Sequence, residues 1–458
     1  MQFKQIKQVR ALALASLTAG IIGLPQAVLA KVPAAEAAKL GSELTPVGAE
    51  KGANKDGSIP AWTPAAQRGA LKGEFPNDAK FDAEKPLFTI SKANMAQYAG
   101  KLTEGHKKLL GMYDSYKMNV YPSHRVVNFP DAILKATAEN AVNCEMIGVD
   151  TPDNCKVGFP FPIPRTGAEP IWNHKMKWRG EAQTRFNNQM IVQPNGQFQL
   201  TKIIEDVTFG YASIKKPLPV TRNSGEFLKY LSKTVAPPRM AGTFILVHEK
   251  AGTGAAGRAA WLYSPGLKRI RRAPTVCCDN PYEGTDGHQF YDQVDMFNGV
   301  LERYNWKLVG KKEMYIPYNS NKISGPKTKY KDIAKARHVN PELPRYELHR
   351  VWIVEADLKE GTSHTFKKRR FYIDEDSWNI AAVDDYDKRD ELYQFQEGHL
   401  IFAYNVMAAT TVPEVIYHFT SGRYFITAAF NEDRPNDASV SFNDDYFSAS
   451  SVQKMTTK

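Results

Sequence analysis

A β-hairpin is encoded by the consecutive residues Trp261–Pro274, which read WLYSPGLKRIRRAP. The Ser-Pro-Gly sequence in the middle favours a tight turn, and the side chains on either side alternate in character as they do in strands. Trp261 and Tyr263 share one face of the first strand, and Arg269 and Arg271 share one face of the second. Aromatic rings beside guanidinium groups suit an amphiphile with an apolar body and an anionic head. The pattern also fits aromatic residues that cover a core while the arginines reach water.

Similar apolar and aromatic runs, separated by turn residues, continue from about residue 170 almost to the C-terminus. They predict strands at Gln197–Asp206, Thr243–Glu249, Ala259–Tyr263, Lys268–Ala273, Arg303–Val309, Arg345–Asp357, Thr365–Ile373, Asn379–Asp385 and Tyr417–Phe430. Few helices interrupt the series, so the predicted fold class is α+β, built on one large antiparallel sheet. A sheet of this size twists and curls, which leaves a concave face for helices or a ligand.

Three segments are predicted to be helical. The first runs from the capping residue Ser91 to about Gly111, and the second, with proline in its first turn, from Pro130 to Met146. The third runs from Gly225 to Val235 and is stopped by two prolines.

Differences in amino-acid composition divide the chain after residue 30 into three segments. Residues 31–90 are rich in Ala, Gly, Pro and Lys and lack periodicity, so we expect a long extended N-terminal arm. A helical segment with a disulfide loop is expected over 91–165, where three closely spaced prolines end it. Residues 166–458 form the predicted antiparallel sheet domain.

Residues 1–30 read as a cleaved secretory signal peptide. Three basic residues and no acid precede the apolar run Ala11–Leu24, and Ala27–Ala30 supplies small residues for cleavage after Ala30. The run is interrupted by glycine and falls short of the ~20 apolar residues of a membrane span. Because the first cysteine is Cys144, no lipid can be attached at the new N-terminus. We therefore expect a periplasmic protein that is not a lipoprotein.

Four cysteines in an oxidising compartment are expected to pair. Cys144 and Cys155 flank a polar turn, which favours a local bridge. Cys277 and Cys278 are adjacent and form either a vicinal disulfide or bonds to distant partners. Of the three pairings that four cysteines allow, we favour the local bridge with the vicinal one. The absence of a Cys-x-x-Cys motif argues against a redox enzyme.

The formal net charge is +11, but the basic residues are spread along the chain. The runs Lys268–Arg272 and Lys367–Arg370 are too short for a continuous nucleic-acid face, so no nucleic-acid partner is expected. We interpret both runs as solvated strand faces. Attraction to anionic lipid head groups is the alternative interpretation.

Motifs for a cofactor, a metal or a catalytic nucleophile all lack their required context. Gly252–Gly257 matches G-x-G-x-x-G but precedes a predicted strand, so we predict a hairpin loop. The histidines are scattered without metal-ligand spacing, and the G-x-S-x-G elbow of hydrolases is absent. Calcium could bind the acidic clusters Asp374–Asp376 and Asp384–Asp387, but turn preferences explain both more simply. We expect no enzyme activity, no cofactor and no metal.

Several stretches in fixed order resemble one family of proteobacterial proteins. They are Leu44–Trp62, Trp261–Pro274, Arg303–Gly310, Tyr315–Asn319, and Arg370–Trp378 leading into Asp384–Asp387. Together they resemble the family called domain of unknown function 1329, which is often labelled as similar to outer-membrane lipoprotein-sorting proteins. The resemblance implies that 166–458 form a half-open β-barrel, like that of the lipoprotein carriers, around an apolar cavity for acyl chains. It also implies an RND-type exporter and an outer-membrane β-barrel protein as partners, and it supplies no catalytic residues.

These observations predict a periplasmic carrier of a lipid-like or other hydrophobic molecule. The expected cavity residues are Trp261, Tyr263, Trp306, Trp352, Phe371 and Trp378 in the wall, with Arg269 and Arg271 near the mouth. Burial of a sixteen-carbon chain would contribute on the order of 10 kcal/mol before entropic costs. Two alternatives stay open: a secreted hydrolase of hydrophobic esters, and a non-catalytic adaptor whose arm docks on an envelope assembly.

Overall fold

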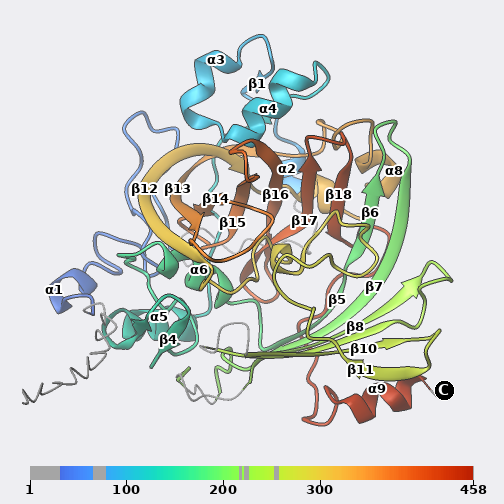
Figure 1. Cartoon of the computed structure of the whole chain (residues 1–458). Coiled ribbons are helices and arrows are strands. Elements are labelled where there is room, and N and C mark those ends of the chain that lie inside the picture. Colours follow the sequence, from blue (N-terminus) through green and yellow to red (C-terminus); the bar gives the residue numbers. More distant parts are fainter. Residues whose placement is uncertain (1–30, 65–78, 216–218, 221–225, 252–256, 457–458) are drawn as a thin grey trace, which may run out of the picture.

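The computed structural model describes residues 31–64, 79–215, 219–220, 226–251 and 257–456 (Figure 1). The predicted signal peptide lies outside these residues, as does the 252–256 part of the predicted hairpin loop.

One sheet dominates the described part of the chain. Its strands are β1 (Phe88–Ile90), β2 (Met118–Val120), β5 (Ala182–Phe186), β6 (Asn188–Val192), β7 (Phe198–Phe209), β8 (Glu226–Ala236), β9 (Phe244–Lys250), β10 (Arg258–Ser264), β11 (Arg269–Arg272), β12 (Tyr304–Pro317), β13 (Tyr346–Leu358), β14 (Lys368–Asp374), β15 (Ile380–Tyr386), β16 (Leu392–Ala403), β17 (Ala408–His418) and β18 (Tyr424–Ala429). A separate hairpin consists of β3 (Glu145–Ile147) and β4 (Thr151–Asp153).

The strand order is β1-β2-β13-β14-β15-β16-β17-β18-β6-β7-β8-β9-β10-β11, with β12 added beside β13 and β5 beside β7. Neighbouring strands are antiparallel, apart from the short contact of β2 with β13. The path ends at β1 and β11, which do not pair with each other, so the sheet is an open half-barrel. Figure 1 shows β12 strongly curled, β7 running along the right side, and β8, β10 and β11 extending away below. The predicted α+β class and curved antiparallel sheet are confirmed.

Helices, most of them short, lie around the sheet (Figure 1). They are α1 (Ala34–Ala37), α2 (Ala79–Asp82), α3 (Met95–Tyr98), α4 (Glu104–Met112), α5 (Asp131–Asn143), α6 (Ala168–Lys175), α7 (Asn321–Ser324), α8 (Tyr330–Ile333) and α9 (Ala449–Thr456), with 3-10 turns at Ala99–Lys101 and Tyr291–Gln293. Every residue of α6 is buried, and this helix ends beside the cavity described below. The C-terminal α9 lies against the sheet beside β11 (Figure 1).

The predicted helix Gly225–Val235 is wrong. Residues 226–236 form β8, which pairs with β7 on one side and β9 on the other. The spacing of Phe227, Leu228 and Leu231 fits a helical face, but the two neighbouring strands satisfy the backbone of this segment and override that preference.

Two further predicted elements are each divided in the structure. The helix expected from Ser91 is interrupted at Leu102, which is extended, and α4 restarts where the Thr103 side chain accepts a hydrogen bond from the His106 amide. The strand expected over Tyr417–Phe430 is two strands, β17 and β18, joined by a turn that contains Gly422.

The N-terminal arm lies on the sheet of its own chain. Val47, Ala49 and Ile59 are buried, and the Val47 carbonyl accepts a hydrogen bond of 3.0 Å from the Trp378 indole. The Glu50 carboxylate pairs with Arg350 at 3.1 Å. This part of the arm therefore covers the turn between β14 and β15.

Cys144 is bonded to Cys155, and Cys277 to Cys278. The first bridge joins the end of α5 to the end of the β3–β4 hairpin across a separation of 11 residues.

We expect replacement of Cys144 and Cys155 by serine to lower the free energy of unfolding by about 3 kcal/mol, because the bridge restricts the unfolded chain. Urea unfolding measures this loss. Replacing Cys277 and Cys278 is the control, since adjacent residues enclose almost no loop; an equal loss in both variants would contradict the loop-entropy explanation.

Candidate ligand-binding cavity

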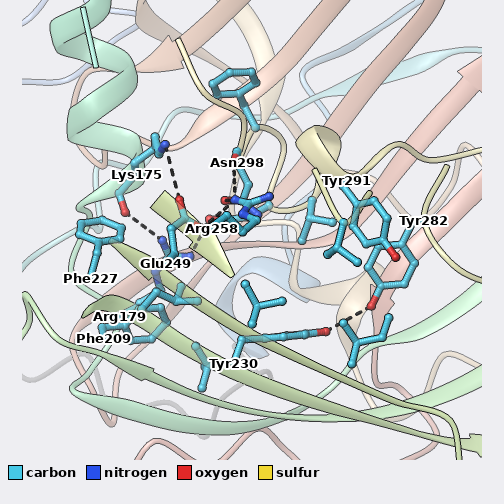
Figure 2. A pocket seen from close by; sticks show the side chains of 18 of the residues that line it. Lys175, Arg179, Phe209, Phe227, Tyr230, Glu249, Arg258, Tyr282, Tyr291 and Asn298 are labelled. Carbon is cyan, nitrogen blue, oxygen red and sulfur yellow. Dashed lines mark hydrogen bonds and ion pairs between the residues drawn. The ribbon is translucent and has the colours of Figure 1, made fainter. Parts of the chain in front are cut away.

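A cavity lies between one face of β7–β10 and the loop Val276–Asn298, and we call it the β7–β10 cavity (Figure 2). Counted with its open mouth, its volume is about 790 Å³. The strands contribute an apolar floor that includes Val207, Phe209, Leu228, Tyr230, Ile245 and Val247. The loop contributes an apolar roof that includes Val276, Tyr282, Tyr291, Val294 and Phe297.

The strand register explains how the floor changes from apolar to charged. Val207, Tyr230 and Val247 lie side by side on successive strands. Two residues further along, the neighbouring row consists of Phe209, Leu228, Glu249 and Arg258. Because side chains two apart in a strand share a face, both rows line the same cavity. The charged groups thus occupy one end of an otherwise apolar floor.

Glu249 is the centre of the charged end. Its carboxylate accepts a hydrogen bond of 2.7 Å from the Arg258 guanidinium and lies 4.0 Å from the Lys175 ammonium group at the end of α6 (Figure 2). Arg258 also donates to the Asn298 carbonyl oxygen in the roof at 3.0 Å, and Lys175 donates to the Gly299 carbonyl at 2.9 Å. Floor, roof and helix therefore meet at this end through charged hydrogen bonds.

A second charged group lies at Asp295 in the roof. Its carboxylate accepts hydrogen bonds from Lys177 at 2.8 Å and Arg179 at 2.6 Å. Burial alone would raise the pKa of Asp295, but the two cations hold that pKa below its ordinary range. The Arg179 guanidinium lies over the Phe209 ring, and its buried Nε has no hydrogen-bond partner. This donor is the one polar atom of the cavity residues, among those described, that is both buried and unsatisfied.

Tyrosines connect the floor with the roof at the other end. The Tyr230 hydroxyl donates to Glu205 at 2.7 Å. It also lies 3.2 Å from the Tyr282 hydroxyl (Figure 2). The centroids of the Tyr282 and Tyr291 rings are 5.0 Å apart. Burial and the Glu205 charge raise the pKa of Tyr230, so the phenol stays neutral.

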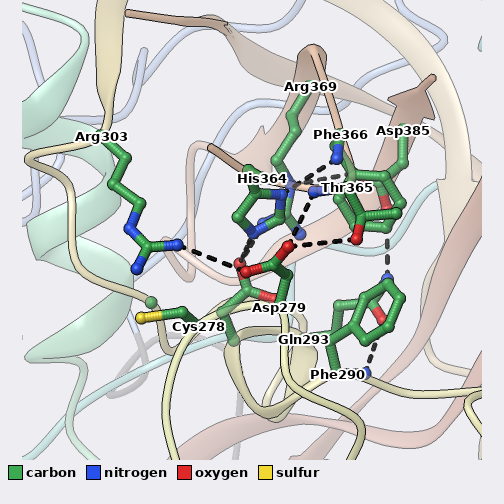
Figure 3. A network of polar contacts seen from close by, with 12 residues as sticks. Cys278, Asp279, Phe290, Gln293, Arg303, His364, Thr365, Phe366, Arg369 and Asp385 are labelled. Atoms are coloured by element: carbon green, nitrogen blue, oxygen red, sulfur yellow. Dashed lines mark hydrogen bonds and ion pairs between the residues drawn. The ribbon is translucent and has the colours of Figure 1, made fainter. Parts of the chain in front are cut away.

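A buried network holds the roof loop on the sheet (Figure 3). Arg369 of β14 is fully buried and donates to Asp292 of the loop at 2.8 Å and to Asp385 of β15 at 2.8 Å. Phe297 and Phe366 lie with ring centroids 5.0 Å from its guanidinium carbon. The prediction that the run Lys367–Arg370 is a solvated strand face is therefore wrong for Arg369, which bonds to a loop that is distant in sequence.

His418 of β17 also holds the roof. Its Nε2 donates to the His288 carbonyl at 3.0 Å, and Gln394 donates to its Nδ1 at 3.2 Å, which fits a neutral imidazole. Burial and, to a smaller extent, the neighbouring His288 lower the pKa of His418 to about 4. The stabilisation from the neutral ring is complete above pH 6.5 and is lost as the pH falls towards 4.

We therefore expect the stability of the wild type to fall more steeply between pH 7 and pH 5 than that of His418→Gln, by about 1–2 kcal/mol. Urea unfolding at each pH measures the difference between the two proteins. Between pH 7 and pH 8 the difference should stay constant, which serves as the internal control. If the free energies of unfolding of the wild type and of His418→Gln changed in parallel over the whole pH range, this role of His418 would be contradicted.

The hairpin residues that the sequence analysis expected in the cavity lie elsewhere. Trp261 and Tyr263 are on the opposite face of β10, where they pack with Phe447 and Val452 of the C-terminal segment. The register places Arg272 beside Trp261, whereas Arg271 is opposite Leu262 on the other face. Arg269 and Arg271 are both exposed and do not line the β7–β10 cavity.

The other expected wall residues form two groups. Trp306 and Phe371 lie behind the cavity residue Phe297, with ring centroids 5.7 and 5.3 Å from it. Trp352 and Trp378 stack on each other beneath the arm, away from the cavity, with ring centroids 6.2 Å apart. The structure thus brings two of the expected residues close to the cavity and separates the rest from it.

The sequence analysis missed the residues that form the charged end. One signal was present: Glu249 ends one predicted strand and Arg258 directly precedes the next, and opposite charges at such positions pair across a hairpin. Lys175 and Asp295 gave no comparable signal, because α6 and the roof loop reach the site from distant parts of the chain.

The family described as protein of unknown function (DUF1329) matches residues 89–453. The chain belongs to the DUF1329 family. The uncharacterized protein PA3922 of Pseudomonas aeruginosa is 43% identical over 411 residues, which cover 89% of this chain and 90% of the relative. The family expected from the sequence is confirmed.

Solved structures similar to this DUF1329 chain include a DUF1329 family protein from Desulfovibrio piger. It is 13% identical, with a TM-score of 0.42, over 62% of this chain and 97% of that one. The LolA superfamily protein NE2245 from Nitrosomonas europaea is 10% identical, with a TM-score of 0.38, over 62% and 98% of the two chains.

Within the residues that the structure describes, no helix combines the length and the apolar character that a membrane-crossing helix needs.

Proposed function

We propose that this DUF1329 protein is a periplasmic, non-catalytic carrier of an amphiphile that has an apolar body and an acidic head. The observation that supports this proposal is the change along one cavity floor from the Val207–Tyr230–Val247 row to the row that ends in Glu249 and Arg258. The apolar body would lie on the first row, and the head would lie at the second.

Charge favours an acidic head. Four cationic side chains line the cavity, namely Lys175, Arg179, Arg185 and Arg258, against the two acids Glu249 and Asp295. Glu205, just outside the lining, pairs with Arg185 at 2.5 Å, so the cationic excess of these groups is one charge. The unsatisfied Arg179 Nε is a donor at the cavity wall. Arginine binds carboxylate and phosphate groups well because its donors form a planar fork.

Apolar contact would supply most of the affinity. Each methylene group moved from water onto the apolar floor and roof contributes ~0.8 kcal/mol before the entropic cost of binding. We propose that the cargo enters and leaves through envelope partners, an RND-type exporter and an outer-membrane β-barrel protein, as the sequence resemblance implies. The predicted signal peptide supports the periplasmic location.

A calorimetric titration with hexadecanoic acid and with hexadecanol tests the proposal on the mature chain. We expect saturable 1:1 binding of both compounds, with the acid bound about tenfold more tightly because of the cationic end. Arg258→Gln should remove most of this preference and leave binding of the alcohol unchanged. The exposed Arg271→Gln is the matched control and should behave like the wild type. Absence of saturable binding for either compound would refute the carrier function.

A further inference from the structure

A buried group of potential metal ligands lies beneath the N-terminal arm, away from the β7–β10 cavity. It consists of His349 on β13, Asp374 at the end of β14 and Asp376 in the turn that follows. One ligand atom from each residue lies within 4.8 Å of those from the other two, and all three side chains are buried. The strands place them together, because β13 and β14 pair with Val351 opposite Asp374.

Asp374 is not neutralised in the way its acidic neighbours are. These neighbours each pair with a cation: Glu347 with Arg345 at 2.6 Å, Glu375 with Lys311 at 2.7 Å, and Asp376 with Arg125 at 2.7 Å. Oδ2 of Asp374 accepts hydrogen bonds from the Ser377 amide and hydroxyl at 2.9 and 2.6 Å. Its Oδ1 is buried and has no hydrogen-bond partner within the described residues. A buried carboxylate oxygen without a partner is costly, so this atom points to a missing positive group.

His349 is held as a metal-bound imidazole commonly is. Its Nε2 lies 3.0 Å from Glu347, and its ring stacks on Tyr318 with centroids 3.7 Å apart. A carboxylate that is hydrogen-bonded to one ring nitrogen fixes the tautomer of the imidazole. It thereby leaves the other nitrogen free to bind a metal ion. Arg125 occupies both oxygens of Asp376, but each carboxylate oxygen retains a second lone pair that can bind a cation.

We propose that His349, Asp374 and Asp376 bind one divalent transition-metal ion, which links β13 to the β14–β15 turn. Imidazole nitrogen together with two carboxylates suits Zn²⁺ or a related first-row ion better than Ca²⁺ or Mg²⁺, which prefer oxygen ligands alone. The ion would neutralise Asp374 at the place where the arm covers the sheet. The sequence alone predicts that Asp374–Asp376 are turn residues without a bound metal. The residues do form the turn, but their side chains are buried.

Titration of the chelator-treated, full mature protein with Zn²⁺ tests this site, and metal analysis of the protein as purified supports the titration. We expect one Zn²⁺ per chain and a dissociation constant that Asp374→Asn weakens by at least about 100-fold. Glu347→Gln removes the carboxylate that orients His349 but leaves all three ligands in place, so it should weaken the binding by about 10–100-fold. Asp114→Asn removes an exposed carboxylate, 86% accessible, and should leave the binding unchanged.

Cobalt loading provides a readout that does not depend on stability. Co²⁺ in this site should give visible absorption bands that are absent from Asp374→Asn and from His349→Gln, while circular dichroism reports whether each variant is folded. Three results would overturn the proposal: no bound Zn²⁺, binding of Ca²⁺ without Zn²⁺, or Zn²⁺ binding that survives unchanged in a folded Asp374→Asn variant.

Discussion

Arg369→Met should lower the free energy of unfolding by about 3–5 kcal/mol, the largest stability effect that we expect from a single substitution in this protein. The guanidinium is fully buried and pairs with Asp292 and Asp385, each at 2.8 Å. Its removal leaves Asp385 without its cation in the core. Among the described residues, Asp292 then keeps the His364 ring, at 2.9 Å, as its side-chain partner. Methionine replaces the packing volume but not the charge. Denaturant unfolding monitored by tryptophan fluorescence measures the loss.

Two further variants make this result specific. Arg389→Ala removes an arginine whose side chain is 72% exposed, and its effect should stay within about 0.5 kcal/mol. Arg369→Lys keeps a charge but cannot reach both carboxylates with a planar fork, so it should be intermediate. An Arg369→Met protein within 1 kcal/mol of the wild type would show that the network does not hold the roof loop.

Val247→Trp should weaken binding of hexadecanoic acid by about 100-fold. Val247 lies between Tyr230 and Ala260 in the cavity floor, and an indole at this position would fill space needed by the ligand. Loss of contact with three or four methylene groups costs about 3 kcal/mol, which corresponds to roughly this factor in affinity. Calorimetric titration, as for the wild type, gives the dissociation constant.

The matched control is Val235→Trp, which introduces the same side chain at an exposed position of β8 that does not line the cavity. It should bind the acid like the wild type. Unfolding measurements on both variants separate a lost site from a lost fold, since overpacking costs typically 1–3 kcal/mol. Unchanged affinity in Val247→Trp would place the ligand outside the β7–β10 cavity.

The sheet was predictable because its strands alternate and are separated by turn residues. β7, β9, β10, β13 and β15 begin and end within a few residues of the predicted positions. β8 was not predictable in this way, because its apolar spacing fits a helix and only its pairing with β7 and β9 decides its structure. The break at Leu102 was missed because Thr103, which caps α4, lies within an apparently continuous helical pattern.

The cavity was harder to predict than the sheet. Alternation shows that Trp261 and Leu262 face opposite ways, but it does not show which face meets a ligand. Here the C-terminal segment with Phe447 covers the Trp261 face, and the loop before Phe297 covers the other. Both covering segments are distant in sequence, so the assignment depends on tertiary structure. Arg369 illustrates the same point, because a basic run gives no sign that one member is buried beside Asp292.

Native mass spectrometry of the protein purified from its native cells, followed by organic extraction, tests the carrier proposal most directly. We predict a chain that carries one amphiphile with an acidic head, and the same preparation of Val247→Trp should lack it. A bare chain mass in the wild type, with no extractable amphiphile, would contradict the proposal.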